Sequence, residues 1–281
     1  MTDTSQSKTP NVDEELVSTL ENGVLTLTIN RAESSNAIPF YVRDRLIQYF
    51  QEAHSDLAVR AIILTGAGER HFCTGSDLRI RPPFAPKPEG APDFVAGSAV
   101  QMMRTGFQRL MESIQDCQKP VIVALNGTAA GGGAMLALAA DLIIASETAR
   151  FVDVFGKQAL IPDGGYLYLL PRIVGMHKAK EIVFFGDTIN AEDALGLGIV
   201  NRVVPGAELA TAAQAWAEQL AAKPTKVLGW AKKLLHDATE VPRTQVLENE
   251  AVYIELNLGT ADGQERMAAM MEKRPPEWKG W

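Results

Sequence analysis

An aspartate with no polar neighbours is the first residue whose type and setting suggest chemistry. Asp163 stands between Ile161-Pro162 and Gly164-Gly165. Desolvation in an apolar pocket raises the pKa of a carboxyl group toward the range in which it can take up and return a proton. The same Asp-Gly-Gly pattern is also typical of a helix N-cap. From these residues alone, both interpretations stay open.

Three consecutive glycines form a second feature with chemical potential. Gly131-Gly132-Gly133 lie in the stretch "NGTAAGGGAMLALAAD", between an apolar run and an Ala/Leu-rich helical pattern. Glycines leave the first amides of a helix unobstructed, and these N–H groups suit a negatively charged or polarised oxygen. The spacing is neither that of a P-loop nor that of a dinucleotide fingerprint. The pattern therefore favours either an oxygen-binding loop or close helix packing.

A third stretch, "HFCTGSDLR" at residues 71–79, repeats this arrangement of strand end, small residues and acid. We expect Asp77 to cap a helix or to lie in its first turn. His71 has no partner in the sequence and is interpreted as a structural or solvent-facing group. Cys73 has no neighbour that would lower the pKa of its thiol, so we expect a small buried residue rather than a nucleophile.

Parallel strands must position these loops. The runs at residues 61–66, 121–127 and 142–146 are continuously apolar and end in small or turn residues, which predicts strands buried on both faces. Residues 23–30 alternate as a half-buried strand does, and residues 37–54 show helical spacing. The sequence therefore predicts an α/β fold.

The chain divides into three predicted parts. Residues 1–15 are expected to be a disordered polar arm, and residues 16–205 the α/β domain. Residues 206–281 are helical, with an apolar stripe from 209 to 220 and further helices at 226–238 and 244–273. This part has too little core to stand alone, so it should pack on the α/β domain and on neighbouring subunits. The proline-rich stretch 81–97 is expected to be a lid, a pocket wall or a mobile insertion.

Composition excludes several classes of protein. With 281 residues, 46% of them hydrophobic, the chain can bury a full core, and its net charge of −7 disfavours a nucleic-acid partner. Cys73 and Cys117 lack metal-ligand spacing, so no metal is expected, and such sparse cysteine fits a reducing compartment. The longest apolar segment, 134–145, is too short to span a bilayer. We expect a cytoplasmic protein with no membrane partner.

Together these segments resemble a known family. The order "NRAESSNAI", "AIILTGAGERHFCTGSDL", "KPVIVALNGTAAGGGAMLALAADLIIASETARF", "LIPDGGYLYLLPRIVG" and "AKEIVFFGDTINAEDALGLGIVNRVVP" resembles the crotonase (enoyl-CoA hydratase/isomerase) superfamily over about residues 16–275. The resemblance implies a spiral of ββα turns with a C-terminal helical region that builds a homotrimer or a dimer of trimers. It also implies an acyl-CoA thioester as substrate, with coenzyme A as part of that substrate and no separate cofactor.

The resemblance assigns site residues as well. It implies that the backbone N–H groups of Cys73 and Gly132 form an oxyanion hole for the thioester carbonyl. Such donors are commonly worth about 3 to 4 kcal/mol each in transition-state stabilisation. The remaining residues implied in substrate binding are Thr74, Gly75 and Ser76, and those implied in coenzyme A binding are Arg31, Asn36, Ala37, Lys273 and Arg274. The last two would meet phosphates from the same or an adjacent subunit, or would be a solvated basic end.

The sequence departs from enoyl-CoA hydratases at both of their catalytic glutamates. Met135 and Phe155 stand at these two positions. Neither side chain transfers protons, and two apolar side chains beside a thioester would make a dry pocket. We favour a pocket-lining role over ordinary core packing for both, and hydration by the two-glutamate route is not expected.

Asp163 then becomes the best-placed acid/base. Its position matches the aspartate of dienoyl-CoA isomerases, of the ring-epoxide phenylacetyl-CoA isomerase and, as nucleophile, of chlorobenzoyl-CoA dehalogenase. Tyr166 and Tyr168 would orient it or simply pack. Asp153 is a second candidate acid, although a solvent-facing charge is favoured. The sequence thus favours a double-bond isomerase, with an unconventional enoyl-CoA hydratase or a non-catalytic acyl-CoA-binding protein as alternatives.

Overall fold

The computed structural model describes residues 11–80, 88–92 and 95–281. Most of the predicted insertion at 81–97 therefore lies outside the described residues, as does most of the predicted disordered arm. That arm is wrongly predicted where it is described, because Val12–Glu15 form helix α1, capped by the Asn11 side chain.

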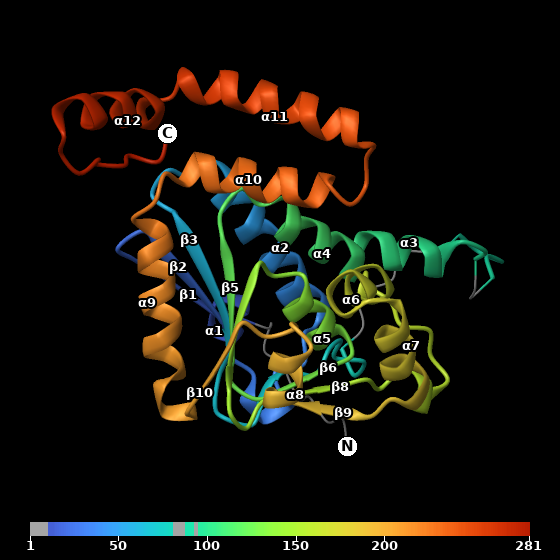
Figure 1. The fold of residues 1–281 in the computed structure, drawn as a ribbon. Coiled ribbons are helices and arrows are strands. Elements are labelled where there is room, and N and C mark those ends of the chain that lie inside the picture. Colours follow the sequence, from blue (N-terminus) through green and yellow to red (C-terminus); the bar gives the residue numbers. More distant parts are fainter. Residues whose placement is uncertain (1–10, 81–87, 93–94) are drawn as a thin grey trace.

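Two sheets form the centre of the molecule (Figure 1). The larger sheet has the strand order β1-β2-β3-β5-β7-β10, and the smaller has the order β4-β6-β8-β9. The strands of the larger sheet are β1 Leu16–Glu21, β2 Val24–Ile29, β3 Ala61–Gly66, β5 Val121–Leu125, β7 Leu142–Ser146 and β10 Arg202–Val204. Those of the smaller sheet are β4 His71–Cys73, β6 Thr128–Ala130, β8 Arg150–Val152 and β9 Thr188–Asn190.

The chain spirals between these sheets. The pairs β3–β4, β5–β6 and β7–β8 each place one strand in the larger sheet and the next in the smaller one, and helices follow each pair. The neighbouring strands β2, β3, β5, β7 and β10 run parallel, as do β4, β6 and β8. The predicted α/β spiral of ββα turns is confirmed. All three continuous apolar runs are strands, and β5 is buried along its whole length.

Eleven helices follow α1 among the described residues. They are α2 Phe40–Ser55, α3 Ser98–Thr105, α4 Phe107–Asp116, α5 Gly132–Leu138, α6 Tyr166–Val174, α7 Met176–Phe185, α8 Ala191–Gly196, α9 Leu209–Ala221, α10 Thr225–Asp237, α11 Arg243–Leu258 and α12 Ala261–Glu272. Single 3-10 turns lie at η1 Ala32–Ser34, η2 Gly156–Gln158 and η3 Gly206–Glu208. The main core lies between the two sheets, α2 and α4 to α8.

The predicted C-terminal helical part is only partly separate from the α/β domain. The apolar stripe of α9, with Leu209, Ala213 and Ala217, packs on the outer face of β2, β3, β5 and β7. The predicted helix 244–273 is two helices. The first ends at Leu258 with Gly259 as its C-cap, and Thr260 caps the next by accepting the Gly263 N–H at 2.9 Å. Helix α11 buries none of its residues and lies at the edge of the molecule in Figure 1.

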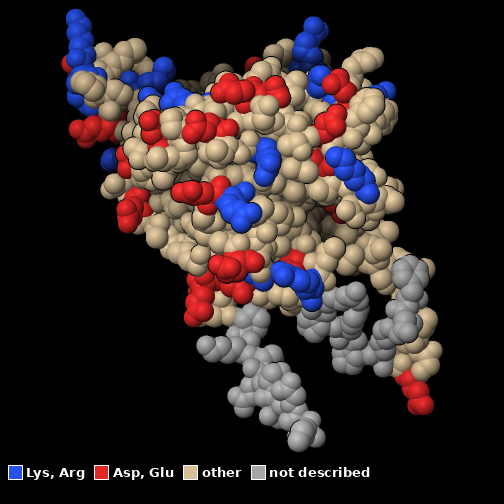
Figure 2. Space-filling view, turned by 90° about the horizontal axis from the view of Figure 1, so that it is seen from below, with Lys and Arg blue, Asp and Glu red and all other residues tan. Residues whose placement is uncertain are grey.

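The surface of the described residues carries mixed charge. On the face in Figure 2, acidic and basic side chains are interspersed, without a continuous basic stripe over the part that the structure describes. Within the described ranges, no helix is both long and apolar enough to cross a membrane.

Candidate active site

The glycine loop packs directly against the end of β4. Gly131 has φ of 51°, a conformation that costs a glycine little, and it precedes the first turn of α5. A Cβ added to Gly133 would lie 1.9 Å from the carbonyl oxygen of Cys73. One added to Gly75 would lie 2.9 Å from the amide nitrogen of Gly132. The structure therefore brings together the two segments that carry the predicted oxyanion-hole amides.

The thiol of Cys73 is not reactive. Cys73 is fully buried, and burial raises the pKa of its thiol to about 12. The thiol is neutral at pH 7, so any contribution of this residue to catalysis comes from its backbone.

The two predicted coenzyme A segments also lie side by side. The Thr74 hydroxyl donates to the Ser35 carbonyl at 3.1 Å, and the Ile38 N–H donates to the Gly75 carbonyl at 2.7 Å. Ile38 and Ser76 form an isolated parallel bridge. These bonds fix the loop after β4 against the turn that ends at α2.

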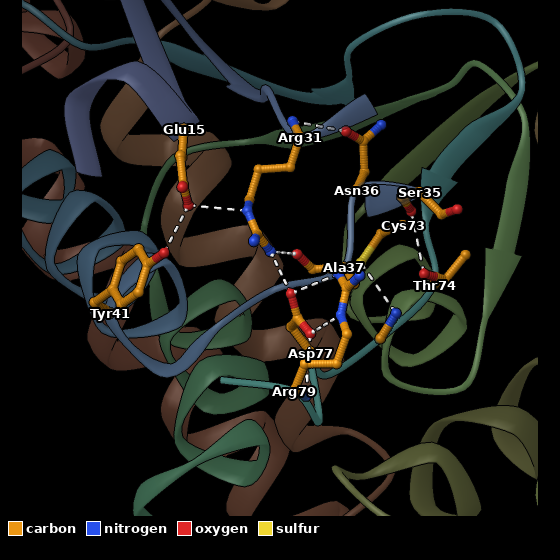
Figure 3. A network of polar contacts seen from close by, with 11 residues as sticks. Glu15, Arg31, Ser35, Asn36, Ala37, Tyr41, Cys73, Thr74, Asp77 and Arg79 are labelled. Atoms are coloured by element: carbon orange, nitrogen blue, oxygen red, sulfur yellow. Dashed lines mark hydrogen bonds and ion pairs between the residues drawn. The ribbon is translucent and has the colours of Figure 1, made fainter. Parts of the chain in front are cut away.

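Arg31 is held in an ion-pair network rather than exposed to solvent (Figure 3). Its guanidinium pairs with Glu15 at 2.9 Å and with Asp77 at 3.0 Å, and it also donates to the Ala37 carbonyl. Asp77 is buried and pairs with Arg79 at 2.9 Å. Asp77 Oδ1 also accepts the Arg79 N–H at 3.2 Å, so the side chain caps a turn. No helix begins among the described residues 77–80, where Asp77 was predicted to cap one.

Asn36 has a structural function in the same turn. Its φ is 53°, its side-chain oxygen accepts the Arg31 N–H at 2.9 Å, and its amide group donates to the carbonyls of Ala67 and His71. The side chains of Arg31 and Asn36 therefore shape the predicted coenzyme A turn. The Ala37 backbone is also bonded within it, since its N–H donates to the Ser34 carbonyl at 3.0 Å. Contact of these three residues with coenzyme A stays a prediction.

Loss of the Asp77 charge should destabilise this turn in a pH-dependent way. The hydrogen bond from Arg79 is the largest influence that lowers the pKa of Asp77, from its ordinary 3.8 to about 2. The stability from this ionised group is present above pH 4 and lost as pH falls through about 2. We expect Asp77→Asn to lower the free energy of unfolding at pH 7 by about 1 to 3 kcal/mol. Chemical denaturation at pH 7, 4 and 2.5 measures the difference, and a pH-independent difference would contradict it.

Met135 and Phe155 are both buried in the main core cluster. A Cβ added to Gly164 would lie 3.2 Å from Met135 Cγ, so Met135 packs against the loop that carries Asp163. The Phe155 ring lies 5.7 Å from the Tyr166 ring, centroid to centroid. The two positions where hydratases carry glutamate thus hold apolar side chains. Met135 contacts Gly164, and Phe155 contacts Tyr166, which both lie close to Asp163 in the chain.

Phe107, which the sequence did not single out, joins the two halves of the site. A Cβ added to Gly132 would lie 2.7 Å from Phe107 Cε1, and one added to Gly164 would lie 3.2 Å from Phe107 Cβ. The Phe107 ring therefore lies against the amide loop, and its Cβ lies against the Asp163 loop. Its helix, α4, was not predicted, although Phe107, Leu110, Met111 and Ile114 show the helical spacing of an apolar face.

Asp163 is half-buried and caps no helix. The N-cap of α6 is Gly165, and no side chain supplies a capping hydrogen bond. Only the Asp163 carbonyl takes part, accepting the Tyr166 N–H at 3.0 Å. Burial raises the pKa of the Asp163 carboxyl group, against a smaller lowering by its own backbone N–H. The N-cap interpretation of its side chain is wrong.

Asp153 is not the solvent-facing charge that was favoured. It is 3% exposed, and its Oδ1 accepts the Phe155 N–H at 2.9 Å. Its Oδ2 is buried and has no partner among the described residues. Tyr168 points elsewhere, since its hydroxyl donates to Glu240 at 2.6 Å.

Lys273 and Arg274 lie beyond α12. Lys273 ends that helix with φ of 56°, and Arg274 pairs with Glu265 and Glu272. In Figure 1, α12 lies apart from α5 and α6, on the other side of α10. A phosphate contact of these two residues from the same subunit has no support here, and one from an adjacent subunit stays a prediction.

A cavity of about 590 Å³ opens between α6, α10 and the start of β7. Its charged lining is already paired, because buried Lys232 binds Asp141 at 2.9 Å and Arg172 binds Glu240 at 2.8 Å. Neither the amide loop nor Asp163 lines it, so the candidate active site is defined by the packed loops described above.

Comparison with known proteins identifies the class to which this fold and these loops belong. The profile of the enoyl-CoA hydratase/isomerase family matches residues 19–281. The chain belongs to this family of acyl-CoA enzymes.

Similar proteins within the family have different activities. The chain is 37% identical over 267 residues to the 1,2-epoxyphenylacetyl-CoA isomerase of Escherichia coli (strain K12), covering 94% of this chain and 98% of the relative. It is 35% identical over 270 residues to the carnitinyl-CoA dehydratase of Proteus mirabilis (strain HI4320), covering 93% and 97%.

Solved structures agree with this fold. The enoyl-CoA hydratase of Bacillus anthracis has a TM-score of 0.84 and 30% identity, over 95% of this chain and 100% of that one. An enoyl-CoA hydratase from Polaromonas sp. JS666 has a TM-score of 0.81 and 31% identity, over 94% and 99%.

Proposed function

We propose that this protein is an acyl-CoA isomerase that moves a carbon–carbon double bond, with Asp163 as its acid/base. The observation that carries the proposal is the setting of Asp163: a half-buried carboxyl group, not a helix cap, whose pKa is raised by burial. Met135 and Phe155 leave the two hydratase positions without a carboxylate. Similarity to a 1,2-epoxyphenylacetyl-CoA isomerase supports isomerisation as well.

The proposed reaction needs one proton-transfer group and one oxyanion site. Ionised Asp163 removes a proton from C2 of a 3-enoyl thioester, and the electrons move into the thioester carbonyl to form a dienolate. The N–H groups of Cys73 and Gly132 stabilise that oxygen. Asp163 then returns the proton at C4, the double bond forms between C2 and C3, and no cofactor is consumed.

Heavy water separates isomerisation from hydration. With a 2-enoyl-CoA in heavy water, the proposal predicts deuterium at C2 or C4 without a 3-hydroxy product, measured by mass spectrometry and NMR. Rapid formation of 3-hydroxyacyl-CoA would instead support the enoyl-CoA hydratase alternative. If the thioester binds without exchange or product, the protein is an acyl-CoA-binding protein, and this proposal fails.

Assembly into a homotrimer, or a dimer of trimers, would complete the coenzyme A site. The exposed apolar side chains of α11 support a subunit contact there, and they are Leu247, Val252, Ile254, Leu256 and Leu258. In such an assembly, Lys273 and Arg274 of an adjacent subunit would meet the phosphates of the substrate. Analytical ultracentrifugation gives the subunit number directly.

A further inference from the structure

The segment from residue 153 to residue 166 carries Asp163, and its two ends are joined by side-chain contacts. At one end, Asp153 Oδ1 accepts the Phe155 N–H at 2.9 Å. The Phe155 ring then packs on Tyr166, with 5.7 Å between ring centroids. At the other end, the Tyr166 N–H donates to the Asp163 carbonyl at 3.0 Å. Three successive contacts therefore link Asp153 to the backbone of Asp163.

The burial of Asp153 lowers the stability of the folded protein. It is 3% exposed, and its second carboxylate oxygen is buried without a partner among the described residues. A buried acceptor without a partner costs about 1 to 3 kcal/mol, and more when it is charged. The charged or titratable groups that act on it are Lys157, from η2, and Tyr166, from α6. Neither makes a hydrogen bond or an ion pair with its second oxygen.

We propose that Asp153 is a positioning residue that fixes the loop carrying Asp163, through the Phe155 amide and the Phe155–Tyr166 ring contact. The catalytic part of this inference rests on the proposed function, because it assigns the role of acid/base to Asp163. Misplacement of a reacting group by about 1 Å can cost about a hundredfold in rate, so a loop anchor remote from the substrate has a measurable effect.

Replacing the carboxylate separates its geometry from its charge. Asp153→Asn keeps an oxygen acceptor for the Phe155 N–H, so kcat should stay within about twofold of wild type. Asp153→Ala removes the acceptor, and kcat for a 3-enoyl-CoA should fall about 10- to 100-fold with KM little changed. Asp187→Asn, an exposed acid between α7 and β9, is the matched control and should change neither parameter.

The charge itself should cost stability. Burial raises the pKa of Asp153. An acid whose pKa is higher in the folded than in the unfolded protein stabilises the fold in its protonated form. This stabilisation is fully present below pH 3.8 and is lost as pH rises through the pKa of the folded protein. Asp153→Asn should therefore melt at a higher temperature than wild type at pH 8, and this gap should close by pH 4. The same comparison with Asp187→Asn should show no such trend.

Hydrogen exchange tests the anchor without any substrate. Backbone amides in residues 155–166 should exchange about tenfold faster in Asp153→Ala than in wild type or Asp153→Asn, because the loop opens locally more often without the Asp153 contact. If Asp153→Ala does not fold, Tyr166→Leu breaks the next contact and should give the same exchange and kcat changes. Unchanged exchange in these variants, or equal loss of activity in Asp153→Asn and Asp153→Ala, would overturn the positioning role.

These readouts also distinguish the two proposals. If wild type moves no double bond but Asp153→Ala loosens residues 155–166 while Asp153→Asn does not, the proposed function fails and the anchor stands. If Asp163 proves essential and Asp153→Ala leaves both kcat and exchange at wild-type values, the anchor fails and the proposed function stands.

Discussion

Asp163→Asn is expected to reduce isomerisation of a 3-enoyl-CoA by about 10²- to 10⁴-fold, the usual contribution of a positioned general acid/base. Asparagine has nearly the same shape as aspartate but cannot accept a proton. Binding of the thioester should persist, because the proposed oxyanion-hole donors are backbone N–H groups of Cys73 and Gly132. Stopped-flow or coupled assays give kcat, and the thermal shift caused by the thioester reports binding.

The stability of the same variant distinguishes a catalytic from a structural role of the Asp163 side chain. Loss of a true N-cap costs about 0.5 to 2 kcal/mol. Because burial raises the pKa of Asp163, its ionised form adds no stability at pH 7, and the stability from its protonated form is lost as pH rises above 3.8. Asp163→Asn should therefore unfold at the same or a higher temperature than wild type at pH 7. Full activity together with lower stability would contradict the catalytic role and would show that the Asp163 carboxyl group is a structural one.

The pH dependence of the wild-type rate follows from the same shift. The active form of Asp163 in the first proton removal is the carboxylate, so kcat should rise with pH through a folded pKa above 3.8 and then level off. In Asp163→Asn the residual kcat should not show this rise with pH.

Local patterns explain why much of the fold was predictable. Residues 61–66 and 142–146 are short apolar runs that end in small or turn residues, which favours a strand covered on both faces, and β3 and β7 have these bounds. The stripe on α9 shows the helical period of a face buried on a sheet. By contrast, the predicted helix 244–273 is interrupted after Leu258 by the Gly259 C-cap and the Thr260 N-cap, within an otherwise helical pattern.

The candidate site was harder to predict because its geometry depends on contacts between distant segments. Asp77 looks like a helix cap locally, but it pairs with Arg31, 46 positions earlier in the chain. Asp153 follows a strand in a manner that fits an exposed turn, but the folded protein leaves it only 3% exposed. Phe107 gains its role from contact with two glycines on other loops. Sequence spacing along one segment carries none of this information.

A single methyl group at Gly133 should disable the site almost completely. Gly133→Ala would place a Cβ 1.9 Å from the Cys73 carbonyl oxygen, and 2.5 Å from its carbonyl carbon. Both atoms belong to the backbone, so no side-chain rotation relieves the clash, and β4 must separate from α5. The two predicted oxyanion-hole amides, of Cys73 and Gly132, would then lose their relative positions. Displacing one such donor typically costs about 10²- to 10³-fold in kcat, and overpacking a core about 1 to 3 kcal/mol in stability.

Gly196→Ala is the matched control for the same substitution. Gly196 lies at the end of α8, and a Cβ added there meets nothing within 4 Å. Alanine is favoured over glycine in a helix by roughly 0.5 to 1 kcal/mol, so this variant should be as stable as wild type or more so, with unchanged kcat. Denaturation followed by circular dichroism and the 3-enoyl-CoA assay measure both variants. Wild-type kcat in folded Gly133→Ala would mean that the apposition of β4 and α5 does not build the catalytic site, and the placement of the oxyanion hole at Cys73 and Gly132 would have to be abandoned.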